Sequence, residues 1–423
     1  MDTRFRGRRL VRMLPLLLVA VSCALPAQAA DDAPLTLDAA VALAVRNAPM
    51  LAADAARVDA AREDRVRAGR LPDPELGIGL DNLTATGGGA FDPLADSMTM
   101  QTIGIVQRIP PRAARAAQRA AADAQVLAAS AQRTLAGADV RQAAADAWVS
   151  LWAAQRRLGL LEVLRGAADV AERASRARLA GGTDGAADAL AARAEAADLD
   201  NRIDAAQAGV EAARAILRRW TGADARAADV ADFAELPVAP ATLLSQLDRQ
   251  APLQQWPARE ASAQASLDAA RAGKRPQWSV GVSYGKRFGS LPDMASVNFG
   301  MTLPLFAGNR QDRDIGARHA ERDAVLAEHE DARRAQRAAV EQRLADWRGW
   351  TRQARRFRDE LVPLAADRSR VALAAYRAGG SLQPWLDARR DEIKTRLDYA
   401  DALATWGRGW AALAYLIPAE ETP

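Results

Sequence analysis

The side chains that most often carry chemistry are scarce in this sequence, and their spacing favours none of the common sites. His319 and His329 lie ten residues apart in one predicted helix, whereas two histidines that share a metal on a helix stand about four apart. Met98 and Met100 offer thioethers that suit soft metals, but a strand places both on one face, where packing or lipid contact is the simpler role. The single cysteine is Cys23. Because no Ser/His/Asp group, phosphate loop or carboxylate pair stands out, we expect no enzyme, no metal site and no cofactor.

The composition excludes several other classes of protein. The chain has 423 residues, of which 49% are hydrophobic but only 5% are aromatic. One cysteine excludes a disulfide framework or a zinc cluster, and 26% charged residues beside so many apolar ones exclude a disordered chain. The net charge of +4 is small and interleaved along the chain, which gives no argument for nucleic-acid binding. Abundant alanine, arginine and leucine favour long helices.

Residues 1–29 have the pattern of an export signal. A basic start precedes an apolar segment over 13–25 that is too short to span a bilayer. Residues 27–29 (AQA) form a small-x-small cleavage site, and an uncleaved anchor is the alternative. Residues 20–23 (AVSC) offer a second alternative, a lipoprotein box in which Cys23 is acylated. No later stretch reaches about 18 apolar residues, so we expect no transmembrane helix.

The mature chain is predicted to consist of two copies of one large structural unit. Landmarks recur in the same order at a separation of roughly 200 residues: Ala48-Pro49 and Ala251-Pro252, Ala68-Gly69 and Ala272-Gly273, Ile109-Pro110 and Leu303-Pro304, Trp148 and Trp347, and Arg178 to Gly182 with Tyr376 to Gly380. We therefore predict a first repeat over residues 30–236, a proline-bearing linker over 237–242, a second repeat over 243–418 and a tail over 419–423.

The same order of elements is expected in both repeats. An opening helix (37–69 and 243–273) leads to two strands, a long alanine-rich helix (113–179 and 312–378), a glycine pair and a return helix (188–220 and 385–416). Pro363 interrupts the second long helix, but the helical pattern resumes after it. Each long helix has about 65 residues and should measure roughly 100 Å.

Four segments alternate apolar residues with small or polar ones at a period of two, which is typical of strands: residues 75–83, 98–109, 277–288 and 297–306. This alternation fits membrane-barrel strands of about 9–11 residues, and two soluble hairpins packed against helices are the alternative. Four strands cannot close a barrel, and lipid tolerates no open sheet edge. Strands that span a membrane therefore require several chains to share one barrel.

These features together resemble the TolC-type outer-membrane efflux proteins, over essentially the whole mature chain. The matching segments are 35–44 (LTLDAAVALA) with 47–49 (NAP), 303–310 (LPLFAGNR), and 376–380 (YRAGG) with 386–389 (LDAR). The resemblance implies a mainly α fold in which long helical hairpins form a periplasmic tunnel and three chains share a twelve-stranded membrane β-barrel. It also implies a homotrimer in outer-membrane lipid, with a periplasmic adaptor and an inner-membrane pump of the RND type as partners.

Within that family, residues 71–76 (LPDPEL), 81–82 (DN) and 107–110 (QRIP) are similar to the branch paired with heavy-metal pumps of the cobalt–zinc–cadmium and copper–silver type. Relatives often carry a Gly-Lys pair after this proline, where the chain has Pro111-Arg112. The implied function is a passive channel of a tripartite efflux pump, with heavy-metal cations as a cargo. Drug or polypeptide export by the same fold is an alternative. A soluble periplasmic adaptor or structural protein is the alternative from another class.

The resemblance also implies that the hairpin tips dock the adaptor or pump and form the gate. The candidate residues at the tips are Gly181, Gly182, Asp184, Asp188, Gly379, Gly380 and Asp387. Asp188 matches the place where family members often carry an acid at the constriction, whereas Pro384 stands at the corresponding place in the second repeat. For Asp184 and Asp188, helix capping after a glycine turn is the alternative role.

Overall fold

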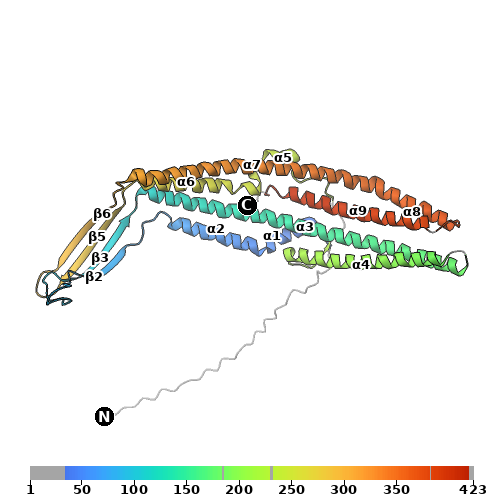
Figure 1. Ribbon diagram of the computed structural model, residues 1–423. Coiled ribbons are helices and arrows are strands. Elements are labelled where there is room, and N and C mark those ends of the chain that lie inside the picture. The colour runs from blue at the N-terminus through green and yellow to red at the C-terminus, as the bar shows by residue number, and fades with distance from the viewer. Residues whose placement is uncertain (1–33, 183–184, 229–231, 382, 419–423) are drawn as a thin grey trace, which may run out of the picture.

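The computed structural model describes residues 34–182, 185–228, 232–381 and 383–418. The predicted export signal with Cys23, the residue Asp184 and the predicted tail lie outside the described residues. Figure 1 shows a long, narrow molecule with a sheet at one end and helices running side by side along the rest. Both helical hairpins turn at the end opposite the sheet, so the predicted tips lie as far from the strands as the molecule allows.

The opening helix of the first repeat is divided in two at a proline. α1 (Leu37–Asn47) begins after Thr36, whose hydroxyl accepts a hydrogen bond from the Ala39 N–H at 3.3 Å. α2 (Pro49–Arg67) begins at Pro49, because the residue before a proline is driven away from the helical conformation and Ala48 is extended. The prediction of one helix over 37–69 is therefore wrong at this position.

The second repeat opens differently from the expected single helix over 243–273. α5 (Pro240–Ser245) is followed by two short 3-10 turns, Leu247–Arg249 and Ala251–Leu253, and regular helix begins only with α6 (Trp256–Ala272). The buried Gln250 side chain holds this irregular segment, since its amide donates to the Leu243 carbonyl at 2.8 Å and its oxygen accepts from Gln336 at 2.7 Å.

The long helices follow the predicted pattern. α3 (Arg112–Ala180) runs for 69 residues without a break, and α4 (Ala186–Thr221) returns beside it. In the second repeat a 3-10 turn (Ala307–Asn309) precedes α7 (Gln311–Arg356), which continues through a π-helical segment (Phe357–Leu361) into α8 (Val362–Arg377), and α9 (Gln383–Ala414) returns. Pro363 lacks an N–H and would clash with the carbonyl four residues earlier, and the wider π turn directly before it relieves both problems.

The sheet joins the two repeats. Its strands are β2 (Glu75–Asp81), β3 (Met100–Ile109), β5 (Trp278–Arg287) and β6 (Met294–Met301), in the antiparallel order β2-β3-β5-β6. β6 begins at Met294 and ends at Met301, so the predicted strand over 297–306 is wrong in its second half, where Pro304 has no N–H to pair. The sequence also missed a short parallel pair, β1 (Pro34–Leu35) with β4 (Arg226–Ala227).

The main core lies where the long helices cross the segments that precede α1 and α5. Trp148 on α3 is fully buried and its indole N–H donates to the Leu35 carbonyl at 2.7 Å. Trp347 on α7, its counterpart in the second repeat, donates to the Phe233 carbonyl at 3.1 Å. Each long helix thus ties down one connecting segment. Among the described residues no helix is both long enough and apolar enough to cross a membrane.

Candidate functional site

The sheet has one apolar face and one glycine-rich face. Residues that oppose each other in register share a face, so the pairing decides which side chains lie together. The apolar face carries Leu76, Ile78, Leu80, Ile103, Ile105, Val280, Val282, Val297 and Phe299. The opposite face carries Gly77, Gly79, Thr102, Gly104, Ser279, Gly281, Ser283, Gly285, Ser296 and Asn298. The predicted alternation is therefore confirmed at most positions, with exceptions in β3 and β5: Gln101, Gln107 and Lys286 lie on the apolar face, and Met100 and Val106 lie on the opposite face.

Both the apolar face and the two sheet edges are left without a partner in the described part of the chain. Ile78 is 78% exposed and Phe299 is 74% exposed. Within the described residues β2 and β6 each pair with one strand only, so their outer edges keep free N–H and C=O groups. A continuous exposed apolar surface of this kind marks contact with lipid or with another protein.

Charged side chains on the glycine-rich face stand at the ends of the strands. Near the helices, Arg108 pairs with Glu75 at 3.0 Å. At the far end, Arg287 donates to the Ser97 carbonyl at 2.9 Å through Nε. Met100 also lies on this face, beside Gly285, and Met98 precedes the strand, so the expectation that both methionines share a strand face is wrong.

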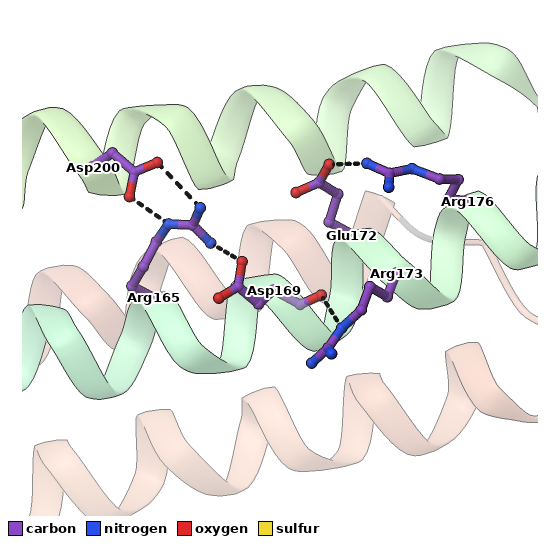
Figure 2. A network of polar contacts seen from close by, with 6 residues as sticks. All are labelled: Arg165, Asp169, Glu172, Arg173, Arg176 and Asp200. Carbon is purple, nitrogen blue, oxygen red and sulfur yellow. Dashed lines mark hydrogen bonds and ion pairs between the residues drawn. The ribbon is translucent and has the colours of Figure 1, made fainter.

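An ion pair joins the two helices of the first hairpin on the approach to its tip, and further pairs lie along α3 (Figure 2). Arg165 on α3 forms a two-pronged pair with Asp200 on α4, with Nε–Oδ1 at 2.6 Å and Nη2–Oδ2 at 3.1 Å. Arg165 also contacts Asp169 on its own helix, and Glu172 pairs with Arg176 one turn further on. The hydrogen bond from Arg165 lowers the pKa of Asp200 below its ordinary value, so this carboxylate stays charged in its pair.

The first tip is a turn of two glycines. The Gly181 N–H donates to the Ala177 carbonyl at 3.0 Å, and Gly182 has φ +74, a conformation that favours glycine. α4 then begins after Gly185, and none of the described side chains caps it. Asp188 lies in the first turn of α4, where the positive end of the helix dipole stabilises its negative charge.

The second tip uses its glycine pair in a different register. Here Gly379 has φ +99, and the Gly380 N–H donates to the Ala375 carbonyl at 3.0 Å. A Cβ at Gly380 would lie 2.9 Å from that oxygen, so only glycine fits without a shift. Tyr376 before the turn stacks on Trp385 after it, with ring centroids 6.0 Å apart. The aromatic pair fastens the start of α9 to the end of α8.

Polar contacts join the two tips to each other. The Arg178 guanidinium at the end of α3 lies 4.3 Å from the centre of the Tyr376 ring, and its Nη1 donates to the Tyr376 carbonyl at 2.9 Å. Arg390 on α9 pairs with Glu195 on α4 at 2.9 Å. The four helix ends therefore form one connected body.

A buried carboxylate stands behind the second tip. Glu392 on α9 is 4% exposed and pairs with Arg389 at 2.8 Å and with Arg396 at 2.9 Å. Burial alone raises the pKa of Glu392, but the two arginines and a hydrogen bond with Ser369 on α8 outweigh it. The net effect places the pKa of Glu392 below its ordinary value of 4.5.

A groove of about 750 Å³ opens between α8 and α9 at the second tip. Val371, Pro384 and Asp387 are among the residues that line it. Asp387 accepts from the Gln383 amide at 2.9 Å and lies 3.6 Å from Arg390. The predicted tip residue Asp387 therefore lines this groove.

Sequence reasoning missed the side chains that hold the tips, although two signals were present. The first signal is that Tyr376 and Trp385 lie on either side of the second glycine pair, close enough in sequence for a tight turn to bring their rings together. The second is that Arg389, Glu392 and Arg396 are spaced three and four residues apart, which places them on one face of a helix. Of the two histidines, His319 is a surface residue as expected, while His329 is partly buried and stacks on Trp256 at 5.2 Å. No group of metal-ligating side chains occurs among the residues that the structure describes.

Comparison with solved structures assigns the fold. The chain matches a membrane protein from Pseudomonas aeruginosa with a TM-score of 0.76 at 20% identity, over 90% of this chain and 92% of the other. It matches the protein CusC with a TM-score of 0.76 at 15% identity, over 90% and 91%, and VceC, an outer-membrane protein of Vibrio cholerae, with 0.72 at 15%, over 90% and 95%. The chain has the TolC-type outer-membrane channel fold. No family model matches its sequence, and the comparison with curated proteins finds no match.

The TolC-type fold explains how the two candidate regions relate. The long helices place the sheet and the tips at opposite ends of the molecule, and the repeated hairpins bring both tips to the same end. The resemblance in the sequence is confirmed at the level of fold. At these identities the match shows the fold alone, and the roles of the sheet and tips rest on their own chemistry.

Proposed function

We propose that this chain is one subunit of a trimeric channel in the outer membrane, which passively conducts cargo from a periplasmic adaptor and an inner-membrane pump of the RND type. The sheet carries this proposal, because one face is apolar and exposed while the other is lined by glycine, serine and threonine. In lipid the free edges of β2 and β6 must pair. Three copies of four strands give a closed barrel of twelve, above the minimum of about eight.

Two neighbouring residues of β6 provide a matched test of this arrangement. Phe299 lies on the apolar face and Asn298 on the glycine-rich face, and both are exposed in the single chain. Phe299→Arg should destabilise the inserted barrel by about 2–4 kcal/mol if it lies near the middle of the bilayer, while Asn298→Arg should be tolerated in a water-filled lumen. The measurement is the amount of heat-modifiable trimer in the outer-membrane fraction. A soluble periplasmic monomer, or equal effects of the two variants, would refute the proposal and favour an adaptor or structural protein.

Heavy-metal cations are the cargo that we propose, on the similarity of residues 71–76 and 107–110 to the heavy-metal branch. The channel itself needs no metal ligands, because a passive duct works by offering a water-filled path. A deletion strain should become sensitive to one or more of zinc, cobalt, cadmium, copper and silver. Sensitivity to drugs alone, or loss of a secreted polypeptide, would assign the other cargo that this fold can carry.

The tips are the proposed docking and gating region. Both glycine turns lie at one end of the molecule, and the groove of about 750 Å³ beside Asp387 opens between α8 and α9 at that end. We include Gly181, Gly182, Asp184, Asp188, Gly379, Gly380 and Asp387 in this region. Crosslinking from a cysteine at Ser381, which lines the groove, should capture the adaptor in cells. The matched cysteine at Ser283 in the sheet should not capture it.

Export to the outer membrane needs the predicted signal over residues 1–29, and two ways of processing it remain distinct proposals. Cleavage after Ala29 would leave a mature chain without cysteine, whereas lipoprotein processing would leave an acylated Cys23 at its start. Mass spectrometry of the mature N-terminus separates them. A Cys23→Ala variant that still reaches the outer membrane in full amount would count against acylation.

A further inference from the structure

A cavity of about 690 Å³ lies beside α3, away from both the sheet and the tips. Its walls come from α3, from the short strand pair β1 and β4, and from α8 and α9. The volume falls within the range of about 300–1,000 Å³ that is common for small-molecule sites. The proposed passage of cargo through the barrel makes no use of this cavity.

Trp152 in the cavity wall has a buried donor without an acceptor. The residue is 3% exposed, and its indole N–H has no hydrogen-bond partner. Other core tryptophans are satisfied, since Trp148 donates to Leu35 and Trp406 donates to Thr351 at 2.9 Å. Buried donors almost always find partners because an unmade hydrogen bond is costly. The same burial closes this N–H to a molecule in the cavity, so Trp152 contributes its ring to the wall and no donor to a ligand.

The described residues that line the cavity include three arginines and no carboxylate. These are Arg156, Arg226 and Arg396. Arg396 forms an ion pair with Glu392 at 2.9 Å, whereas Arg226 forms no ion pair with any described residue. The charge of Arg226 indicates a ligand that is negatively charged.

Apolar and aromatic side chains complete the cavity wall. Leu160 and Leu403 line the cavity together with the arginines, and Tyr399 provides a phenol group. Burial raises the pKa of Tyr399, although Arg358 and Arg156 oppose this effect, so the phenol remains a neutral donor at physiological pH. A site with cationic groups, neutral donors and an apolar surface suits a molecule with an anionic head and an apolar body.

We propose that this cavity binds an amphipathic organic anion, a carboxylate or sulfonate carried on an aromatic or aliphatic body. The acidic head lies at Arg226, where it can form a charge-assisted hydrogen bond. The body lies against Leu160 and Leu403. Tyr399 supplies a further donor. Because Phe357 of the π-helical segment stacks on Tyr399 at 6.0 Å, the ligand sits beside the irregular part of the second long helix.

Gly159 gives a way to close the cavity without disturbing its walls. It lies in the interior of α3, where glycine is less favourable than alanine, and it lines the cavity. A Cβ at this position meets no atom within 4 Å, so Gly159→Leu places its side chain in the cavity. Gly166 is the matched control, because it is a further α3 glycine with the same open surroundings but does not line the cavity.

The test measures binding of naphthalene-1-sulfonate and of the neutral 1-naphthylmethanol to the full protein in lipid nanodiscs, by equilibrium dialysis against empty nanodiscs. We expect saturable binding of one sulfonate per chain and at least tenfold weaker binding of the neutral compound, as one charge-assisted hydrogen bond predicts. Gly159→Leu and Arg226→Gln should each weaken sulfonate binding about tenfold or more. Gly166→Leu should leave it unchanged.

Three results would overturn the proposal: no saturable binding by the unmodified protein, equal binding of the two compounds, or full binding by Gly159→Leu. A second copy of the chain that fills the cavity in the assembly would also overturn it. In that case a Gly159→Cys variant would resist 2-sulfonatoethyl methanethiosulfonate while Gly166→Cys reacts. Dialysis reports on binding alone, so its outcome is independent of whether the chain exports any cargo.

Discussion

Both hairpin tips contain a Gly-Gly pair, but different side chains stabilise the two turns. At the second tip Tyr376 and Trp385 stack across the turn and are both buried. In the aligned first repeat Arg178 stands at the position of Tyr376, and residues 186–193 at the start of α4 include no aromatic residue, so the first tip has no aromatic anchor of its own. The guanidinium of Arg178 instead lies over the ring of Tyr376, the residue at the equivalent position of the second repeat.

This contrast shows how two copies of one structural unit can take different structural roles. Equivalent residues of the two repeats meet at one level of the molecule, and one aromatic anchor then serves both tips. The second tip is expected to be the rigid reference and the first tip the part that moves relative to it. The variants below separate the two, beginning with the largest expected effect.

The glycine turns should be indispensable at both tips. Proline at Gly182 requires φ near −65°, against the observed +74, and proline at Gly380 removes the N–H that donates to Ala375. Gly182→Pro and Gly380→Pro should each abolish export in a resistance assay while trimer still accumulates in the outer membrane. The control is Gly182→Asn, which tolerates the left-handed conformation and should retain export. Normal export by both proline variants would show that the tips do not dock a partner.

Loss of the buried carboxylate should selectively loosen the second tip. Glu392→Ala leaves Arg389 and Arg396 without their shared partner and should cost about 3–5 kcal/mol of local stability. Hydrogen exchange of the α8 and α9 amides measures this, with α4 amides as the internal reference. Equal loss of protection in α4 would mean that the two tips unfold as one unit.

Removing the aromatic anchor should make the second tip resemble the first. Trp385→Ala deletes a side chain that is 6% exposed and should cost about 3 kcal/mol, as for other large-to-small changes in a packed site. We expect amide exchange at Gly379 to rise towards that at Gly182. If the two rates stay as different as in the unmodified protein, the stack is not the source of the contrast.

Acid should weaken the second tip before the first. The folded pKa of Glu392 lies below 4.5, so the stability from this carboxylate is present above pH 4.5 and is lost as the pH falls through the folded pKa. Protection of the α8 and α9 amides should therefore decline below pH 4.5. Glu392→Gln cannot titrate at this position and should remove that part of the pH dependence.

The contact between the tips should contribute least. Arg178→Lys keeps the charge but loses the flat guanidinium that lies on Tyr376, which should cost about 0.5–1 kcal/mol. A double-mutant cycle with Tyr376→Leu measures the coupling, since that change removes the ring and keeps an apolar side chain. A coupling energy of zero would mean that the two tips are held independently.

Much of the fold follows from local patterns in the sequence. The period of two predicted strand β5, and the helical period predicted helix α3. Both predictions agree with the structure because each period reflects the apolar face of one element, which depends on residues close together in the chain. Two of the errors lie at prolines, where the effect depends on context: Pro49 divides α1 from α2, and Pro304 lies beyond the end of β6. Pro363 interrupts the second long helix as predicted, and a π-helical segment accommodates it.

The candidate sites were predictable only in part. The glycine pairs marked both turns, because few other residues adopt positive φ. The buried Glu392 and the lone donor of Trp152 gave no local signal, since burial and a missing acceptor depend on elements that are distant in the chain. The short pair β1 and β4, which forms one wall of the cavity, escaped prediction for the same reason.

The sequence by itself determined the order of elements, the two faces of each strand and the places where the helices turn, because each depends on residues close together in the chain. The tertiary structure alone decided that β3 pairs with β5, that Arg178 lies on Tyr376, and that α3 meets β4 and α9 around a cavity. Such contacts join residues that are far apart in the chain. They arise from how the two repeats pack on each other, which no local period encodes.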